Sequence, residues 1–203
     1  MKALSFPLVR HMAAAALVGA ALAGCATAPA PESSQRELVV AITASHELIT
    51  FHAGQPDRIL ERRPVTGLPT GERLVGIDFR VARGVLYALS QAGRLYTLDI
   101  PTGALRPVGP APAVLGLRGT AFGFDFNPAA DRIRVVSNTG QNLRLHPDTG
   151  AAVDGDPAVE GVQPDPALRY AWSDTHAGRN PDIAGAAYTY NAQDSKITTN
   201  YAI

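Results

Sequence analysis

The sequence predicts an all-β protein made of propeller-like repeats, each a four-stranded antiparallel sheet, and an internal repeat is the main support. A 28-residue stretch occurs twice, 47 residues apart and without a gap, with nine identical positions. Its clearest part aligns Gly76-Ile77-Asp78-Phe79 with Gly123-Phe124-Asp125-Phe126. A fixed period of roughly 40 to 50 residues is typical of propeller blades and other repeat arrays. Short β-branched and aromatic runs bounded by turn residues favour the same fold class.

Each copy of the repeat divides into four strand-sized segments. We expect strands over 74–79, 85–89, 94–100 and 104–108 and, one period later, over 121–126, 132–136, 142–146 and 150–153. Gly93 and Gly140 stand at equivalent turns after the second strand of each copy. Glycine adopts positive φ at little cost, so both turns are predicted to use that conformation.

Partial repeats flank the two copies. Segments 38–42, 47–51 and 58–62 match the second, third and fourth strands of the unit, and the place of the first strand is empty. A last repeat is expected over 185–191 and 196–203. Together, 38–203 spans about three and a half periods, whereas closed propellers usually have at least four blades. We therefore expect an incomplete propeller domain over 38–203, either truncated or closed by a partner.

Residues 1–24 have the pattern of a bacterial lipoprotein signal peptide. Lys2 and Arg10 precede and flank a short apolar run, and Leu22-Ala23-Gly24-Cys25 resembles a lipobox. The apolar run is too short to span a membrane. Cys25, the only cysteine, is therefore predicted to be lipidated, and the Ala/Pro/Ser-rich residues 25–37 form a tether. A plain signal peptide is the alternative.

These features predict an exported, membrane-anchored lipoprotein of the bacterial cell envelope. Ala26 after the lipidated cysteine favours the outer membrane over inner-membrane retention. Basic and acidic residues balance at 18 each, and no basic cluster of the kind that binds nucleic acid is present in the sequence. The expected partners are thus the membrane, through Cys25, and a small-molecule or protein ligand.

Several segments resemble a bacterial family known as domain of unknown function 4394. They are LVGIDFR (74–80), LYAL (86–89), GRLY (93–96), GTAFGFDFNP (119–128), DRIRVVSNTGQNLR (131–144) and AAYT (186–189). The resemblance covers roughly 38–203 and implies a propeller-like, usually exported protein. Members of the family normally continue beyond a strand like 198–203, which agrees with the expected truncation. The resemblance brings no catalytic residues with it, so function stays open.

Asp78 and Asp125 are the first candidate site, because they occupy equivalent places in adjacent repeats. If their strands are innermost, the two carboxylates can ring a channel and bind a cation, and oxygen ligands suit Ca²⁺. The alternative is that each aspartate caps a turn or accepts backbone N–H bonds within its own sheet. The last repeat is expected to have Thr189 at this position, which interrupts a ring of acids.

The connection between 153 and 184 is the second candidate site. It is 17 residues longer than its counterpart, judged from the shift between Asn127 and Asn191, and long loops are often functional. Its candidate ligand-binding residues are Trp172, Asp174, His176 and Arg179, with Tyr170 and Asp182 nearby. An aromatic with convergent polar groups suits a sugar or another small ligand. The alternative is a loop that packs Trp172 over the sheet.

Other patterns are weaker. Asp148, Asp154, Asp156 and Glu160 are expected to be solvated turn residues, because their spacing does not fit a calcium-binding loop. No nucleophile elbow, phosphate loop or zinc-protease motif occurs.

The leading hypothesis is a binding or scaffold module without enzyme activity or a cofactor. A hydrolase or lactonase that uses Asp78, Asp125 and a divalent cation is the second, and a non-functional remnant of a longer gene is the third.

Overall fold

The computed structural model describes residues 36–109, 115–194 and 196–203, and this part of the chain is all-β. The predicted signal peptide, Cys25 and most of the predicted tether lie outside the described residues. The strands are β1 (Leu38–Ile42), β2 (Glu47–His52), β3 (Gln55–Pro64), β4 (Leu74–Arg80), β5 (Val85–Ser90), β6 (Leu95–Asp99), β7 (Ala104–Pro107), β8 (Phe122–Asn127), β9 (Arg132–Ser137), β10 (Asn142–Leu145), β11 (Ala186–Tyr188) and β12 (Asn200–Ala202). One 3₁₀ turn, η1 (Val81–Arg83), is the helical element of these ranges, and no helix in them is long and apolar enough to cross a membrane.

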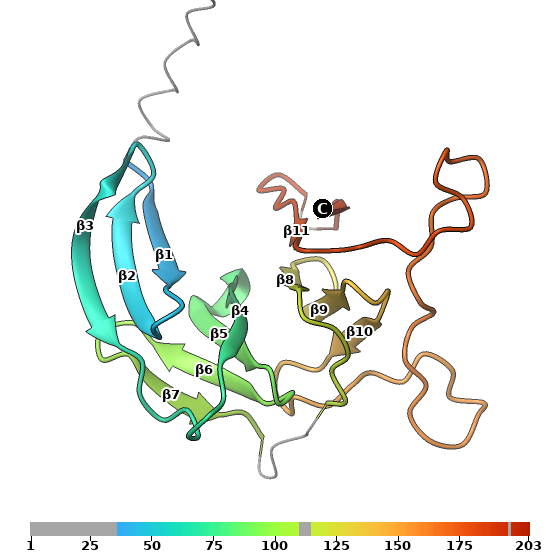
Figure 1. The fold of residues 1–203 in the computed structure, drawn as a ribbon, viewed down its shortest axis with the longest axis horizontal. Helices are drawn as coiled ribbons and strands as arrows, with labels where there is room; N and C mark the ends of the chain where they lie inside the picture. Colours follow the sequence, from blue (N-terminus) through green and yellow to red (C-terminus); the bar gives the residue numbers. More distant parts are fainter. Residues whose placement is uncertain (1–35, 110–114, 195) are drawn as a thin grey trace, which may run out of the picture.

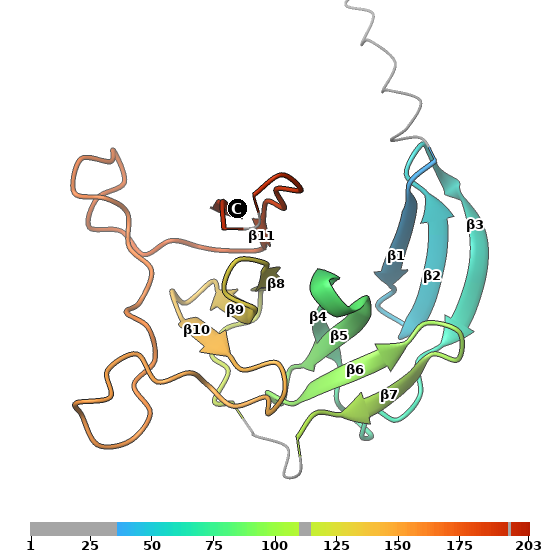
Figure 2. The ribbon, with the colours of Figure 1, turned by 180° about the vertical axis from the view of Figure 1, so that it is seen from behind.

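The strands form four small antiparallel sheets. The first sheet has the order β1-β2-β3, the second β4-β5-β6-β7, the third β10-β9-β8 and the fourth β11-β12. Figures 1 and 2 show the sheets one after another along an open arc, with β1 and β4 toward its inside and β3 and β7 toward its outside. Strand β8 packs between β4 and β11. Within the described ranges no strand pairing joins the first sheet to the fourth.

The strand predictions are largely confirmed, with two corrections. Residues 150–153 were expected to form a strand, yet they make only one bridge, between Leu145 and Ala152. The reason is local, because the Asp154 carboxylate accepts the N–H groups of Asp156 and Gln163 and turns the chain away. The last repeat is also shorter than expected, since only 186–188 and 200–202 pair as strands. There the Asn191 side chain accepts two N–H groups and starts a turn.

Two hydrophobic cores lie between neighbouring sheets, and side chains of β5 contribute to both. Successive side chains of a strand point to opposite faces. Leu86 and Ala88 therefore pack in the core between the first and second sheets, whereas Tyr87 and Leu89 pack in the core between the second and third sheets. Both faces of β5 are buried, which explains its nearly continuous run of apolar residues.

Glycines set how closely the sheets approach. A Cβ at Gly76 would lie 2.4 Å from the Cβ of Phe124, and one at Gly123 would lie 2.5 Å from the backbone N of Ala186. The repeated glycine is thus needed because the first strand of the next sheet lies directly against it. Gly93 and Gly140 have φ of 78° and 76°, which confirms the prediction of positive φ.

Replacing Gly123 with alanine is expected to lower the free energy of unfolding by about 1–3 kcal/mol, because the new methyl group overpacks the contact with Ala186. Thermal unfolding followed by circular dichroism measures the change. Gly116→Ala is the matched control, since a Cβ there meets no atom within 4 Å. A Gly123→Ala variant as stable as the control would contradict the proposed role of this close approach.

Candidate functional site

Asp78 and Asp125 connect successive sheets. The Asp78 carboxylate on β4 accepts the backbone N–H of Phe126 on β8 at 2.7 Å. The Asp125 carboxylate on β8 in turn accepts the N–H of Tyr188 on β11 at 2.6 Å. Aspartates that accept backbone N–H bonds were the expected alternative to a cation site, but within their own sheet; the structure places these bonds between sheets.

The two carboxyl groups are also neighbours, and each perturbs the pKa of the other. The pKa of Asp125 is raised to about 7, mainly by burial and also by the neighbouring Asp78 charge, while the bond from the Tyr188 N–H opposes the shift. Burial also raises the pKa of Asp78, although its backbone bonds oppose the shift. Two carboxylates this close cannot both ionise at low cost, so the pair holds one proton near neutral pH.

The first strand of the fourth sheet also donates an N–H to the preceding sheet, but it has no aspartate of its own at the equivalent position. Tyr188 takes the place of Phe126 as the N–H donor, so the residue that corresponds to Asp125 in the strand register is Ala187. The expected position, Thr189, follows from aligning the Asn127 and Asn191 turns, which have the same side-chain bonds to the residues two and three positions on. Two extra residues therefore lie between Tyr188 and the Asn191 turn.

A cavity of about 340 Å³ opens beside the carboxyl pair. It is lined by Asp78, Asp125, Asp131 and Arg80, by the aromatic residues Phe79, Phe126, Tyr188 and Tyr190, and by four smaller residues of the β4 and β8 ends. Its lining thus comes from the second, third and fourth sheets. Pockets that combine an apolar wall with a few convergent polar groups are the usual form of small-molecule sites.

Arg80 is the fixed cation of this cavity. Its side chain is only 4% exposed, and its Nε and Nη2 atoms donate to both carboxylate oxygens of Asp131 at 2.8 and 2.5 Å. Its Nη1 donates to Asp148 at 2.6 Å. Bonds from Arg80 hold the pKa values of Asp131 and Asp148 below the usual range. Asp148 is therefore an ion-pair partner, whereas Asp154 and Asp156 are turn residues as predicted.

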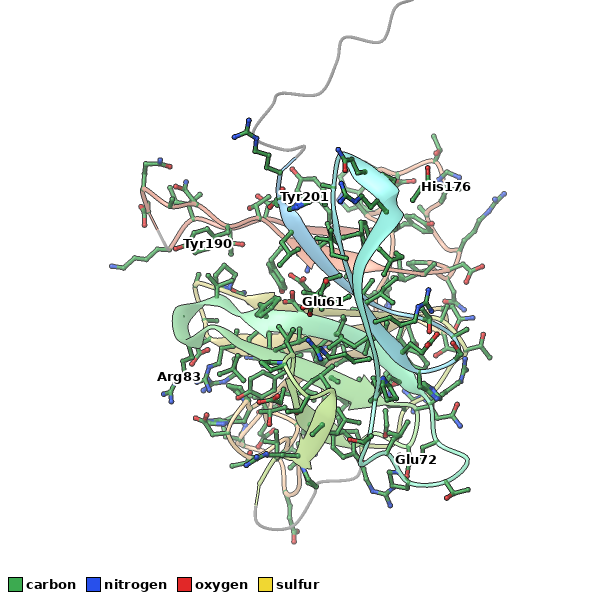
Figure 3. The ribbon with its side chains drawn as sticks, turned by 90° about the vertical axis from the view of Figure 1, so that its left-hand side faces the viewer. Glu61, Glu72, Arg83, His176, Tyr190 and Tyr201 are labelled. Carbon is green, nitrogen blue, oxygen red and sulfur yellow. The ribbon has the colours of Figure 1, made fainter. Side chains whose placement is uncertain are left out.

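The candidate ligand-binding residues of the long connection do not line this cavity. Figure 3 shows His176 and Tyr190 at opposite sides of the molecule. Trp172 is 92% exposed, so the alternative, a loop that packs Trp172 over the sheet, is wrong. Asp174 accepts the backbone N–H of His176 at 2.7 Å and lies 3.1 Å from its Nδ1, and Tyr170 stacks against the same ring. Arg179 donates its backbone N–H to His176 O in a turn. No group of three metal-ligating side chains occurs within the described ranges.

Asp165 fixes the long connection to the third sheet, and the sequence around it did not predict this role. Asp165 is bound by Arg144, through Nε and Nη2 at 2.7–2.9 Å, and by Arg134 Nη1 at 2.5 Å. Burial alone would raise the pKa of Asp165, but the two guanidinium groups outweigh it and lower the pKa. Arg134 also reaches the Tyr188 hydroxyl at 3.3 Å, so this cluster connects the long loop, the third sheet and the cavity wall.

Stability is expected to fall as pH rises from about 4 to 7. The folded pair keeps a proton up to about pH 7, whereas the unfolded carboxyls lose theirs near pH 4, so the folded state binds more protons in this window. Solvent reaches both groups, which reduces the loss to about 1 kcal/mol. Asp125→Asn should remove most of this slope, because an amide oxygen still accepts the N–H of Tyr188 and the amide does not titrate.

Thermal unfolding at several pH values measures this slope. Asp57→Asn, on the exposed strand β3, should leave the slope unchanged. An Asp125→Asn variant with the same pH dependence as the original chain would show that the carboxyl pair is not its source.

Comparison with known proteins assigns the chain to a family. No curated protein matches the chain at a significant level. Residues 47–203, more than three quarters of the sequence, match the family described as domain of unknown function (DUF4394). Since this match spans β2 to β12, with both aspartates and the long connection, the chain belongs to the DUF4394 family.

Proposed function

We propose that this protein is a binding module of the cell envelope and that its ligand, a small organic cation, occupies the cavity beside Asp78 and Asp125. The observation that carries the proposal is the composition of the cavity, in which a half-buried carboxyl pair lies next to four aromatic side chains. The finer architecture belongs to the same proposal: the four sheets are blades of an incomplete propeller, and the cavity lies at the inner ends of three of them.

Charge favours a cationic ligand. Asp131 is neutralised by Arg80, which also pairs with Asp148. Among the described residues Asp78 and Asp125 have no such partner, since their carboxylates accept backbone N–H groups. The pair therefore keeps about one negative charge near neutral pH. An ammonium group donates hydrogen bonds to carboxylate oxygens and compensates this charge.

The aromatic wall favours an organic cation over a hydrated ion. Phe79, Phe126, Tyr188 and Tyr190 all line the cavity, and Tyr190 is exposed enough to form its rim. A cation over an aromatic face gains about 0.5–2 kcal/mol, more when water is excluded. The apolar part of the ligand would cover these rings while the charged end meets the carboxyl pair.

Benzylamine and benzyl alcohol form a matched pair of probes, because they have similar shapes and differ in charge. At ten times its Kd, benzylamine is expected to stabilise the fold by about 1.4 kcal/mol, or about 3–6 °C in Tm. Benzyl alcohol at the same concentration should give a much smaller shift. Titration calorimetry at pH 7 gives the affinities directly.

Two variants locate the binding site. The double change Asp78→Asn and Asp125→Asn should abolish the preference for the amine, whereas Trp172→Ala should leave it intact. Equal binding of amine and alcohol, or an amine affinity unchanged in the double variant, would refute the proposed ligand class. Loss of binding in Trp172→Ala would move the site to the long connection with Asp174, His176 and Arg179.

A divalent cation is the second candidate occupant, because Asp78 and Asp125 line the same cavity and are close enough to influence each other's pKa. Calcium takes six to eight oxygen ligands, so water or substrate would complete its shell, and the shared proton would leave first. In that case the protein is a cation-dependent hydrolase or lactonase. Millimolar Ca²⁺ should then raise Tm more at pH 8 than at pH 6 and displace benzylamine. No Tm shift at either pH would eliminate this candidate.

The envelope location rests on Cys25, which lies outside the described residues. Acyl chains on this cysteine would anchor the domain, with 25–37 as its tether. Cys25→Ser is expected to move the protein from the membrane fraction to the soluble fraction, since the mutant lacks the acceptor sulfur. The intact mass of membrane-extracted protein should equal the chain from Cys25 plus its acyl groups. A mass without acyl groups would contradict the lipoprotein assignment.

A further inference from the structure

The first sheet differs from the second and third sheets in one respect. Strand β5 lies between β4 and β6, and β9 lies between β8 and β10. The internal repeat makes β1 the equivalent of β5, because Ala41 corresponds to Ala88 at the same 47-residue offset. Strand β1, however, pairs with β2 alone among the described residues. Its other side is thus an open strand edge at the place that β4 and β8 occupy in their own sheets.

The backbone groups on this edge can be assigned. Thr43 donates to Glu47 O, and Glu37 O accepts from Ala53, so the odd-numbered residues of β1 bond to β2. Hydrogen bonding alternates along an antiparallel strand. The N–H and C=O groups of Leu38, Val40 and Ile42 therefore point to the open edge.

A groove of about 500 Å³ lies between this edge and β4. Ile42, Thr43 and His46 line it from the end of β1, and Leu74, Gly76 and Ile77 are among the residues that line it from β4. A strand paired with β1 would run along this groove. This added strand would pack against β4 in the same way as β4 packs against β8.

The repeat also indicates which residues such a strand needs. The N–H of Phe126 is bound by Asp78 of the preceding sheet, and the N–H of Tyr188 by Asp125. Phe79 is the equivalent of Phe126, but among the described residues no carboxylate of the first sheet accepts its N–H. An acidic residue on a strand beside β1 would complete the series. Glycine two positions earlier would allow close contact with Ile77, as Gly76 does with Phe124.

We propose that the open edge of β1 is a docking site for an extended peptide segment with the pattern Gly-x-Asp, added as an antiparallel strand. In the register of β4 on β5, Gly76 pairs with Leu89 and Asp78 with Tyr87. One period earlier, the incoming glycine lies opposite Ile42 and the incoming aspartate opposite Val40. The partner is thus a protein or peptide that donates one strand, with affinity from the main chain and specificity from the aspartate.

The probe is a fluorescent peptide with the sequence of residues 72–81, ERLVGIDFRV, which contains β4. Fluorescence anisotropy with the full chain should show saturable binding of one peptide per chain. Changing the peptide's aspartate to alanine should weaken binding at least tenfold, whereas asparagine, which still accepts an N–H, should restore most of it. The amide resonance of Phe79 should shift with the aspartate peptide and not with the alanine peptide.

Val40→Pro is the protein variant, because proline removes an N–H from the open edge and none from the β1–β2 pairing. It should weaken peptide binding at least tenfold, and circular dichroism checks that it folds. The peptide variants test the proposal on the unaltered chain even if Val40→Pro does not fold. Equal affinity for the aspartate and alanine peptides would overturn the proposal. So would a folded Val40→Pro variant with unchanged affinity, or sedimentation showing that a second copy of the chain holds this edge and excludes the peptide.

Discussion

The arrangement of the second, third and fourth sheets depends on one kind of contact: a carboxylate on the first strand of one sheet accepts a backbone N–H from the first strand of the next. Asp78 makes this bond to Phe126, and Asp125 makes it to Tyr188. The bonds require adjacent first strands to lie close together, and the glycines at 76 and 123 leave the space for it. The cavity forms where these strands end. The close spacing of the first strands, the pair of carboxyl groups and the cavity beside them thus have a common origin.

The same contact has an electrostatic consequence. Because the link recurs in consecutive sheets, it brings two carboxyl groups together, and burial makes them share a proton. Most structural carboxylates gain stability from full ionisation next to a cation, as Asp131 does beside Arg80. The Asp78 and Asp125 pair instead accepts backbone N–H groups, and no cation pairs with it in the part of the chain that the structure describes. A structural repeat can in this way generate a site with a perturbed charge without a separate catalytic motif.

Much of the fold could be predicted because its signals are local. Alternating side chains and turn glycines mark β4 to β10, and the 47-residue offset relates them to one another. The strand expected over 150–153 failed because the Asp154 side chain turns the chain, a competition that residue preferences do not resolve.

The site was only partly predictable. Equivalence in the repeat indicated that Asp78 and Asp125 belong together, but not that they bond across sheets. The Arg80 ion pairs with Asp131 and Asp148 join residues 51 and 68 positions apart, and the Asp165 cluster joins residues 21 and 31 apart. No short-range pattern contains such pairs, because they exist only once the sheets have packed.

The exposure of Trp172 has a practical consequence for studying this molecule. It is the only tryptophan of the chain, and at 92% exposure its indole is surrounded by solvent in the folded state. Its emission spectrum should therefore resemble that of an unfolded peptide before and after denaturation. Intrinsic tryptophan fluorescence would report little about the cores, while it offers a built-in optical label for anything that touches the long connection.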